Sequence, residues 1–204
     1  MAELTDSLTQ LLEGRSDEIG RRIGADGAQT QSAITAAVPA LLAALSADSD
    51  RGGGLKQAIQ RDHDGSIIDQ LPAYLEGKAQ LSPRTTNGSG ILEHALGDRQ
   101  PQMQQALSAK SGLDLGSIAK LLPLLAPIIM GMLGKRGGAS GGSAGSGGIG
   151  LDDIGDLLNR EKTDARSTNP DIGDILDSFG TSGSSKATSG GLGDMLGNVL
   201  GKKG

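Results

Sequence analysis

The chain has 204 residues, a net charge of −5, no cysteine and an aromatic content of only 1%. This balance argues against nucleic-acid binding, which needs a basic face or aromatic stacking platforms, and the lack of cysteine excludes disulfides, thiolate nucleophiles and cysteine-ligated zinc. Any core must therefore be aliphatic, which favours closely packed helices over a β-sandwich.

The chain divides into a predicted folded part, residues 1–136, and a predicted flexible tail, residues 137–204. The boundary is the Gly/Ser-rich stretch 137–148, which buries too little apolar surface to offset the entropy of ordering it. Leucines and isoleucines recur at helical spacing through the folded part. We therefore expect an all-α fold, a compact bundle of short helices followed by a Gly/Ser-rich, largely disordered tail.

Several residues mark where the first helices begin and end. Gly14 suits the end of the first helix, and Asp26 is placed to cap a longer one. Pro39 lies inside the apolar pattern of that longer helix. Because proline removes a helical hydrogen bond and restricts the residue before it, a kink or a break is expected near Val38.

The segment Asp62-His63-Asp64-Gly65 invites comparison with a calcium-binding loop. If Gly65 held the sixth position, the first and twelfth would be Gln60 and Leu71, so the bidentate glutamate of such loops is missing. Asp64-Gly65 is instead a turn signal, and the polar residues around it can cap a short helix. We interpret the segment as a capped turn and expect no metal site.

The second half of the folded part repeats the pattern of the first half. A shift of 84 residues aligns residues 6–45 with residues 90–129 without a gap. The matched pairs include Leu8 with Leu92, Leu12 with Leu96, Ile19 with Met103, Ile23 with Leu107, Ile34 with Ile118, Pro39 with Pro123 and Leu41 with Leu125. This predicts two related helical units, each covering the other's apolar face. The alternative is that two unrelated amphipathic stretches fall into partial register.

A series of short motifs runs through the second unit. The motifs are Gly90-Ile91-Leu92-Glu93-His94-Ala95-Leu96-Gly97, a Gln/Ala-rich helix, Ser111-Gly112-Leu113 and the apolar run from Ile118 to Lys135. This order resembles the YidB-like family, a bacterial domain of unknown function. The resemblance covers about residues 1–136. It implies an all-helical fold and no established activity.

Three similar pentapeptides lie in the tail, and each reads aliphatic, Gly, Asp, aliphatic, Leu. They are Ile154-Gly155-Asp156-Leu157-Leu158, Ile172-Gly173-Asp174-Ile175-Leu176 and Leu192-Gly193-Asp194-Met195-Leu196. In a helix the first, fourth and fifth residues share a face, and glycine lets the backbone approach a partner. Each peptide is too short to form a stable helix alone in water. We interpret them as docking peptides that fold in an apolar groove and gain avidity from flexible links.

In this interpretation each aspartate anchors the first helical turn or orients the docked peptide, and the aliphatic residues fill the groove. The candidate partner-binding residues are therefore Ile154, Asp156, Leu157, Leu158, Ile172, Asp174, Ile175, Leu176, Leu192, Asp194, Met195 and Leu196. The groove can belong to another protein, to a membrane surface or to the chain's own helical domain. The alternative is low-complexity sequence with no specific role.

No combination of residues suggests catalysis. His63 and His94 are the only histidines, and neither has a cysteine or a second histidine at ligand spacing. No serine lies in a nucleophile elbow. We therefore expect no catalytic, cofactor-binding or metal-binding residues. The prediction is a non-enzymatic protein-interaction or self-assembly module, whose partner is another protein or a second copy of the chain and not a nucleic acid.

The alternative function is that of a membrane-peripheral or membrane-active protein that uses residues 118–134 and the tail peptides as apolar anchors. The apolar run Leu121–Leu133 is short for an ordinary membrane span and contains two prolines. Anionic lipids would also repel the aspartates of the tail peptides. Membrane binding is therefore the second choice, and because the N-terminus lacks the pattern of a signal peptide, a cytoplasmic protein is expected.

Overall fold

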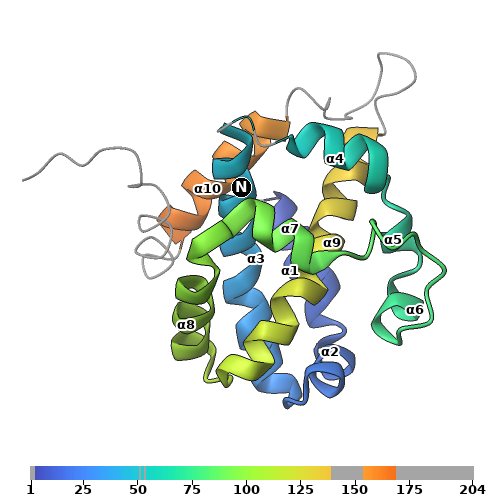
Figure 1. Ribbon diagram of the computed structural model, residues 1–204. Helices are drawn as coiled ribbons and strands as arrows, with labels where there is room; N and C mark the ends of the chain where they lie inside the picture. The colour runs from blue at the N-terminus through green and yellow to red at the C-terminus, as the bar shows by residue number, and fades with distance from the viewer. Residues whose placement is uncertain (1–2, 51, 53, 139–153, 169–204) are drawn as a thin grey trace, which may run out of the picture.

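The computed structural model describes residues 3–50, 52, 54–138 and 154–168, and every regular element within them is helical (Figure 1). The all-α fold class is therefore confirmed. In chain order the elements are α1 (Glu3–Glu13), α2 (Ser16–Ile23), α3 (Gly27–Asp50), α4 (Leu55–Asp62), α5 (Ser66–Asp69), α6 (Leu71–Leu75), α7 (Gly88–Leu96), the 3₁₀ helix η1 (Gly97–Arg99), α8 (Gln100–Ser111), α9 (Leu115–Gly138) and α10 (Ile154–Thr168).

Helices α3 and α9 form the centre of the bundle, and each is 24 residues long. α1, α2, α7, α8 and α10 pack against α3, while α2, α4, α5, α7 and α8 pack against α9. Residues 40–46 of α3 and 124–130 of α9 are all buried. Two consecutive turns of each helix are thus enclosed on every side, which explains why these turns are almost entirely apolar.

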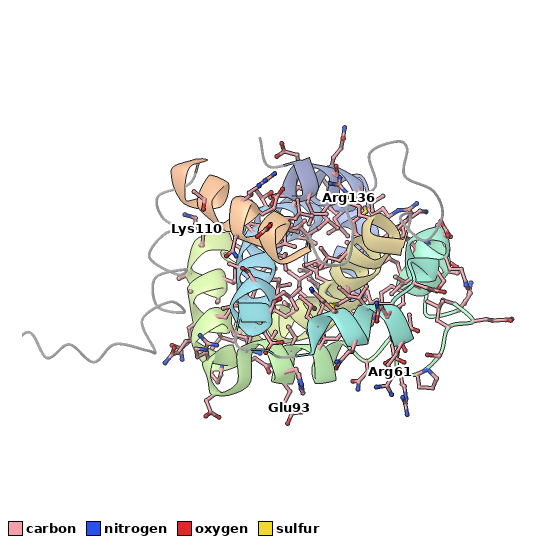
Figure 2. All side chains as sticks on the ribbon, turned by 90° about the horizontal axis from the view of Figure 1, so that it is seen from above. Arg61, Glu93, Lys110 and Arg136 are labelled. Carbon is pink, nitrogen blue, oxygen red and sulfur yellow. The ribbon has the colours of Figure 1, made fainter. Side chains whose placement is uncertain are left out.

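Charged side chains surround an aliphatic interior. Figure 2 shows Arg61, Glu93 and Lys110 pointing away from the bundle. Arg136, near the end of α9, reaches α1 instead, where its guanidinium donates a hydrogen bond to Ser7 Oγ over 3.1 Å. The bundle is therefore held together by apolar packing, with polar contacts joining helices at its edge.

Aspartates cap the two central helices. Asp26 Oδ1 accepts a hydrogen bond from the amide of Gln29 over 2.9 Å, which confirms the predicted cap of α3. Asp114 Oδ1 accepts one from the amide of Ser117 over 3.0 Å at the start of α9. Each carboxylate pairs with one of the amides that the first turn of a helix leaves without a partner.

Pro39 lies inside α3, which continues from Gly27 to Asp50. A kink or a break was predicted near Val38. The prediction of a break is wrong, because the helix continues through Pro39. Proline removes one hydrogen bond from the helix. Burial of the apolar residues that follow it offsets that loss, so the chain remains helical.

The bounds of the helices refine the predicted internal repeat. α2 and α8 begin 84 residues apart, as the gap-free alignment requires, but α3 and α9 begin 88 residues apart. Gly24 and Gly112 end the preceding helices with φ of 87° and 73°, and they are also 88 residues apart. Because α8 is about one turn longer than α2, Pro39 corresponds to Pro127 rather than to Pro123. A common origin of the two units stays a prediction.

Two glycines of α9 let the α4–α5 segment lie close to it. A β-carbon at Gly134 would overlap the carbonyl oxygen of His63, and one at Gly131 would overlap Cγ2 of Ile67. Only glycine fits such close approaches without a shift of the backbone. This contact fixes α4 against α9 and so builds one wall of the pocket described below.

The first two residues of the predicted tail, 137 and 138, are the last two residues of α9. Of residues 137–204 the structure describes the end of α9 and the whole of α10, and the other residues of this range lie outside the described part. α10 packs against α3 and α1. Figure 1 shows it lying along one side of the bundle.

Candidate functional site

The first of the three repeated peptides forms the beginning of α10. Leu158 is fully buried, and Leu157 is partly buried and packs against the core. Asp156 is exposed in the first turn, where a negative charge favours the helix. The backbone of Ile154 is helical, but its side chain lies outside the described part of the chain. One candidate peptide is thus docked on the chain's own helical domain.

Gly155 does not serve the purpose predicted for it. A β-carbon at this position would meet no atom within 4 Å, so close approach of the backbones is not the reason for glycine here. The docked face of α10 instead begins with its leucines. Gly155 therefore lowers the intrinsic helix stability of α10 without adding a contact.

Glu161, one turn beyond the pentapeptide, makes the strongest polar contact of α10. Its side chain is only 3% exposed. Oε1 accepts a hydrogen bond from the amide of Leu4 over 3.0 Å, and Oε2 accepts bonds from the amide over 3.1 Å and the hydroxyl of Thr5. The carboxylate thus satisfies two amides that have no partner within the first turn of α1. It also places a negative charge at the positive end of the α1 dipole.

A second polar contact joins α10 to α3. Ser46 Oγ, in a residue only 1% exposed, donates a hydrogen bond to Asn159 Oδ1 over 3.1 Å. Leu158 and Glu161 lie on either side of Asn159 in sequence, so one stretch of α10 contacts both α1 and α3. The dock therefore combines an apolar anchor, a carboxylate at a helix N-terminus and a neutral hydrogen bond.

The other two candidate peptides lie outside the described residues, so their predicted role stays a prediction. Their candidate residues are Ile172, Asp174, Ile175, Leu176, Leu192, Asp194, Met195 and Leu196. The docked first peptide shows that the eighth position also contacts the domain. That position holds Glu161 in the first peptide, Phe179 in the second and Val199 in the third. Extending the helical spacing to this position, one turn beyond the repeat, would have found it in the sequence.

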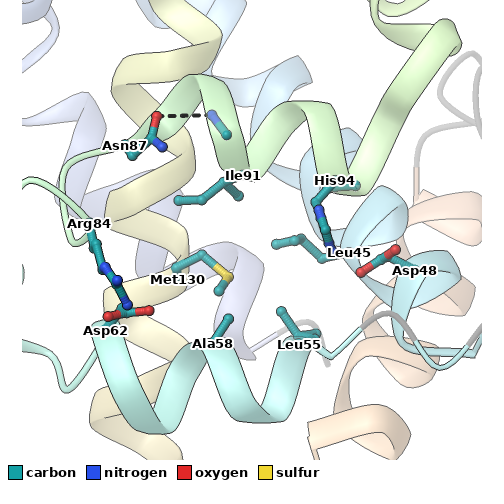
Figure 3. A pocket seen from close by; sticks show the side chains of 12 residues that line it. Leu45, Asp48, Leu55, Ala58, Asp62, Arg84, Asn87, Ile91, His94 and Met130 are labelled. Carbon is teal, nitrogen blue, oxygen red and sulfur yellow. Dashed lines mark hydrogen bonds between the residues drawn. The ribbon is translucent and has the colours of Figure 1, made fainter.

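A pocket of about 260 Å³ lies between α3, α4, α7 and α9 (Figure 3). Apolar side chains from all four helices line it, and they are Leu45, Leu55, Ala58, Ile91, Ala95 and Met130. The polar lining residues are Asp48, Asp62, Arg84, Asn87 and His94. Figure 3 shows Arg84 pointing towards Asp62 on one side and His94 pointing towards Asp48 on the other. The pocket thus has an apolar floor with polar groups around its opening.

One of the polar residues at the opening of the pocket, Asn87, caps the beginning of a helix. Asn87 Oδ1 accepts a hydrogen bond from the amide of Gly90 over 3.0 Å and so begins α7 (Figure 3). His94 lies one helical turn after Gly90, exposed at the opening. No side chain that lines the pocket carries a hydroxyl or thiol nucleophile. The arrangement therefore suits binding of an apolar group better than covalent catalysis. Sequence reasoning missed the pocket because its walls come from four separate helices.

The predicted turn before α5 is held by the side chain of Asp64, while Gly65, which directly precedes α5, offers no side-chain cap. Asp64 Oδ1 accepts a hydrogen bond from the amide of Ser66 over 3.0 Å. Next to it, His63 is 3% exposed, and its Nδ1 has no hydrogen-bond partner. Burial lowers the pKa of His63, while the charges of Asp62 and Asp64 oppose this shift. His63 is therefore a neutral, buried side chain of the α4–α5 junction.

One comparison with known proteins identifies a family. The family described as "Bacterial protein of unknown function (DUF937)" matches residues 6–136, which is more than half of the chain and covers α1 to α9 except at their ends. No curated protein and no solved structure matches the chain. The docked α10 lies beyond the matched region.

Proposed function

Since the chain belongs to this bacterial family, to which no activity is attached, we propose that it is a non-enzymatic protein-interaction or self-assembly module. Its helical domain receives short helical peptides, and its C-terminal segment supplies three of them. The observation that carries the proposal is the docked first peptide, with Leu158 buried and Glu161 bonded to the start of α1.

The kind of partner follows from where the first peptide docks. Its groove belongs to the chain's own domain, so an equivalent groove exists on every copy. When a peptide leaves its own domain, it can bind that of a neighbouring molecule. Such a contact is head-to-tail, and it grows in one direction unless it closes into a ring. Self-association is therefore the form of interaction that the dock supports best.

We further propose that the chain is YidB-like within its family. The motifs behind this resemblance occupy consecutive elements of the fold. Gly90–Gly97 covers most of α7 and the first residue of η1, Ser111–Leu113 lies at the end of α8 and before α9, and the apolar run from Ile118 to Lys135 lies within α9. This grouping bears on the fold and adds no activity.

The proposal is tested by the light-scattering mass of the full chain over a concentration series. The test variant replaces Leu157, Leu158, Ile175, Leu176, Met195 and Leu196 with Ser. We expect the mass of the native chain to rise with concentration and that of the variant to stay constant, because serine does not fill an apolar groove. The matched control changes six Ser or Thr residues between the peptides to Ala and should behave like the native chain. A constant monomer mass for the native chain up to about millimolar concentration, where exchange between chains competes with docking within one chain, would exclude self-assembly.

The alternative is a membrane-peripheral protein located at the bilayer rather than free in the cytoplasm. Two described helices, over Gly27–Ser49 and Leu115–Gly137, are long and apolar enough to cross a membrane. The shortness of the apolar run Leu121–Leu133 therefore does not exclude a membrane span, because the helix that contains this run is longer. However, 78% and 67% of their most apolar windows are buried inside the bundle. Salt-insensitive co-sedimentation with vesicles that depends on residues 118–134 would favour this alternative over a cytoplasmic module.

A further inference from the structure

The pocket between α3, α4, α7 and α9 lies directly beside the docked α10. Ser46, which bonds to Asn159 of α10, is next to Leu45 and two residues from Asp48 on α3, and both of these line the pocket. No residue of α10 lines it. The α10 dock and the pocket are therefore neighbouring sites on one turn of α3.

We infer that this pocket binds the second repeated peptide of the same chain, residues 172–179, with Phe179 as its anchor. The inference rests on the proposed function, because it takes the repeated peptides to be docking peptides. Ile172, Ile175, Leu176 and Phe179 follow the i, i+3, i+4, i+7 spacing of a helix that lies in a groove. The first peptide has the same spacing, and the structure shows it helical and docked.

The groove beneath α10 is unsuitable for the second peptide. Phe179 takes the position of Glu161, whose two oxygens accept hydrogen bonds from the amides of Leu4 and Thr5. A phenyl ring accepts neither bond and would leave both amides buried without a partner. The second peptide therefore needs a different surface, one that is apolar at this position.

The pocket matches a single large aromatic side chain. Its volume of about 260 Å³ lies below the roughly 300–1,000 Å³ of pockets for drug-sized ligands. Met130, 2% exposed, is part of its lining (Figure 3), and a thioether makes favourable contacts with aromatic rings. Phe179 is the only phenylalanine of the chain. The only tyrosine, Tyr74, is buried elsewhere, with its hydroxyl donating to the carbonyl of Leu124.

The connection is long enough for docking within one chain. From Asn159 to Thr168, α10 runs for about 14 Å along its axis at 1.5 Å per residue. Asn169-Pro170 follows at once, and this dipeptide favours a turn and does not continue a helix. Residues 169–171 reach about 10 Å when extended, and a helical 172–179 adds about 10 Å. A reversed chain therefore brings Phe179 back to the level of Asn159 and the pocket.

Disulfide crosslinking in the full chain tests this inference, because the chain has no native cysteine. The test pair is Ala58→Cys, in the pocket wall, with Phe179→Cys. One control pairs Phe179→Cys with Leu115→Cys, since Leu115 is 49% exposed and lies about 22 Å from Met130 along α9. A second control pairs Ala58→Cys with Val199→Cys from the third peptide. A third pair, Ser46→Cys with Asn159→Cys, reports the α10 dock itself.

We expect the 58–179 bond to form within single chains at least about tenfold faster than either control, because docking holds the two positions at a high effective concentration. Equal rates for the 58–179 and control pairs would overturn the inference. A 58–179 bond that forms only between chains would also overturn docking in the same chain. If 46–159 forms while 58–179 does not, the inference fails and the proposed docking function stands; if neither forms, both fail.

Discussion

Glu161 shows how one carboxylate can select a docking peptide. Its oxygens accept the amides of Leu4 and Thr5 at the start of α1, in a site where its side chain is 3% exposed. Each hydrogen bond to a charged acceptor contributes about 1.5–3 kcal/mol to stability, which is more than a hydrogen bond between two neutral groups contributes. Removing the acceptor also leaves buried amides unpaired. The residue at the eighth position therefore distinguishes the first peptide, which has a carboxylate there, from the second and third, which have Phe179 and Val199.

Replacing Glu161 with Gln should loosen the start of α1. The amides of Leu4 and Thr5 lie in the first helical turn and depend on Glu161 for an acceptor. We expect their hydrogen exchange, followed by NMR, to accelerate by roughly tenfold to a hundredfold, which corresponds to about 1–3 kcal/mol. Asp156→Asn makes the same chemical change on an exposed carboxylate of α10 and should leave both amides protected. Equal exchange in the two variants would show that Glu161 does not hold α1.

His63 links the stability of the fold to pH. Its side chain is buried and Nδ1 has no hydrogen-bond partner, so the charged imidazolium is disfavoured. Burial lowers the pKa of His63 below its ordinary value of 6.5. Above pH 6.5 both folded and unfolded chains hold His63 neutral. Below pH 6.5 the unfolded chain takes up the proton first, so the free energy of unfolding decreases as the pH falls towards the folded pKa.

We therefore expect the His63→Gln variant to lose part of the acid sensitivity of the native chain. The measurement is the urea midpoint of unfolding at pH 7.5 and at pH 5.5. Once the pH is below the pKa of His63 in both the folded and the unfolded chain, each unit by which burial lowers the pKa reduces the free energy of unfolding by about 1.4 kcal/mol. An unchanged pH dependence in His63→Gln would show that another group causes it.

At the scale of elements, helical periodicity was enough to predict most of the domain. The leucine and isoleucine spacing indicated helices, and Asp26 indicated where α3 begins, because these signals act within one or two turns. Pro39 was the local signal that misled, since its effect on α3 depends on the helices that surround it. Tertiary packing thus overrode a strong local preference.

The candidate site was harder to predict than the helices. The repeated Gly-Asp motif identified the segment that becomes α10, and it correctly singled out Leu158 as an apolar contact. Helical spacing extended by one turn points to position 161, but nothing in the sequence shows that the partner of Glu161 is the first turn of α1. The pocket between α3, α4, α7 and α9 was unpredictable for the same reason, since its lining residues are separated by up to 85 positions, from Leu45 to Met130.

At the scale of the whole molecule, the chain carries both the groove that holds α10 and two further peptides that we propose to dock. Fifteen residues, 139–153, separate the end of α9 from the beginning of α10. A connection of this length and Gly/Ser-rich composition gives the first peptide a local concentration in the millimolar range. Docking within one chain therefore dominates in dilute solution. Exchange between molecules becomes competitive only where the chains are concentrated or clustered.

The most direct test of the account is whether the first peptide binds the helical domain when the two are separate molecules. A peptide of residues 151–168 is titrated into the chain shortened to residues 1–138, and the NMR shifts of the Leu4 and Thr5 amides report binding. The account predicts saturable binding of one peptide, lost with Leu158→Ser and kept with Asp156→Ser, because Leu158 is buried in the dock and Asp156 is exposed. Unchanged amide shifts, or equal binding by the two variant peptides, would contradict it.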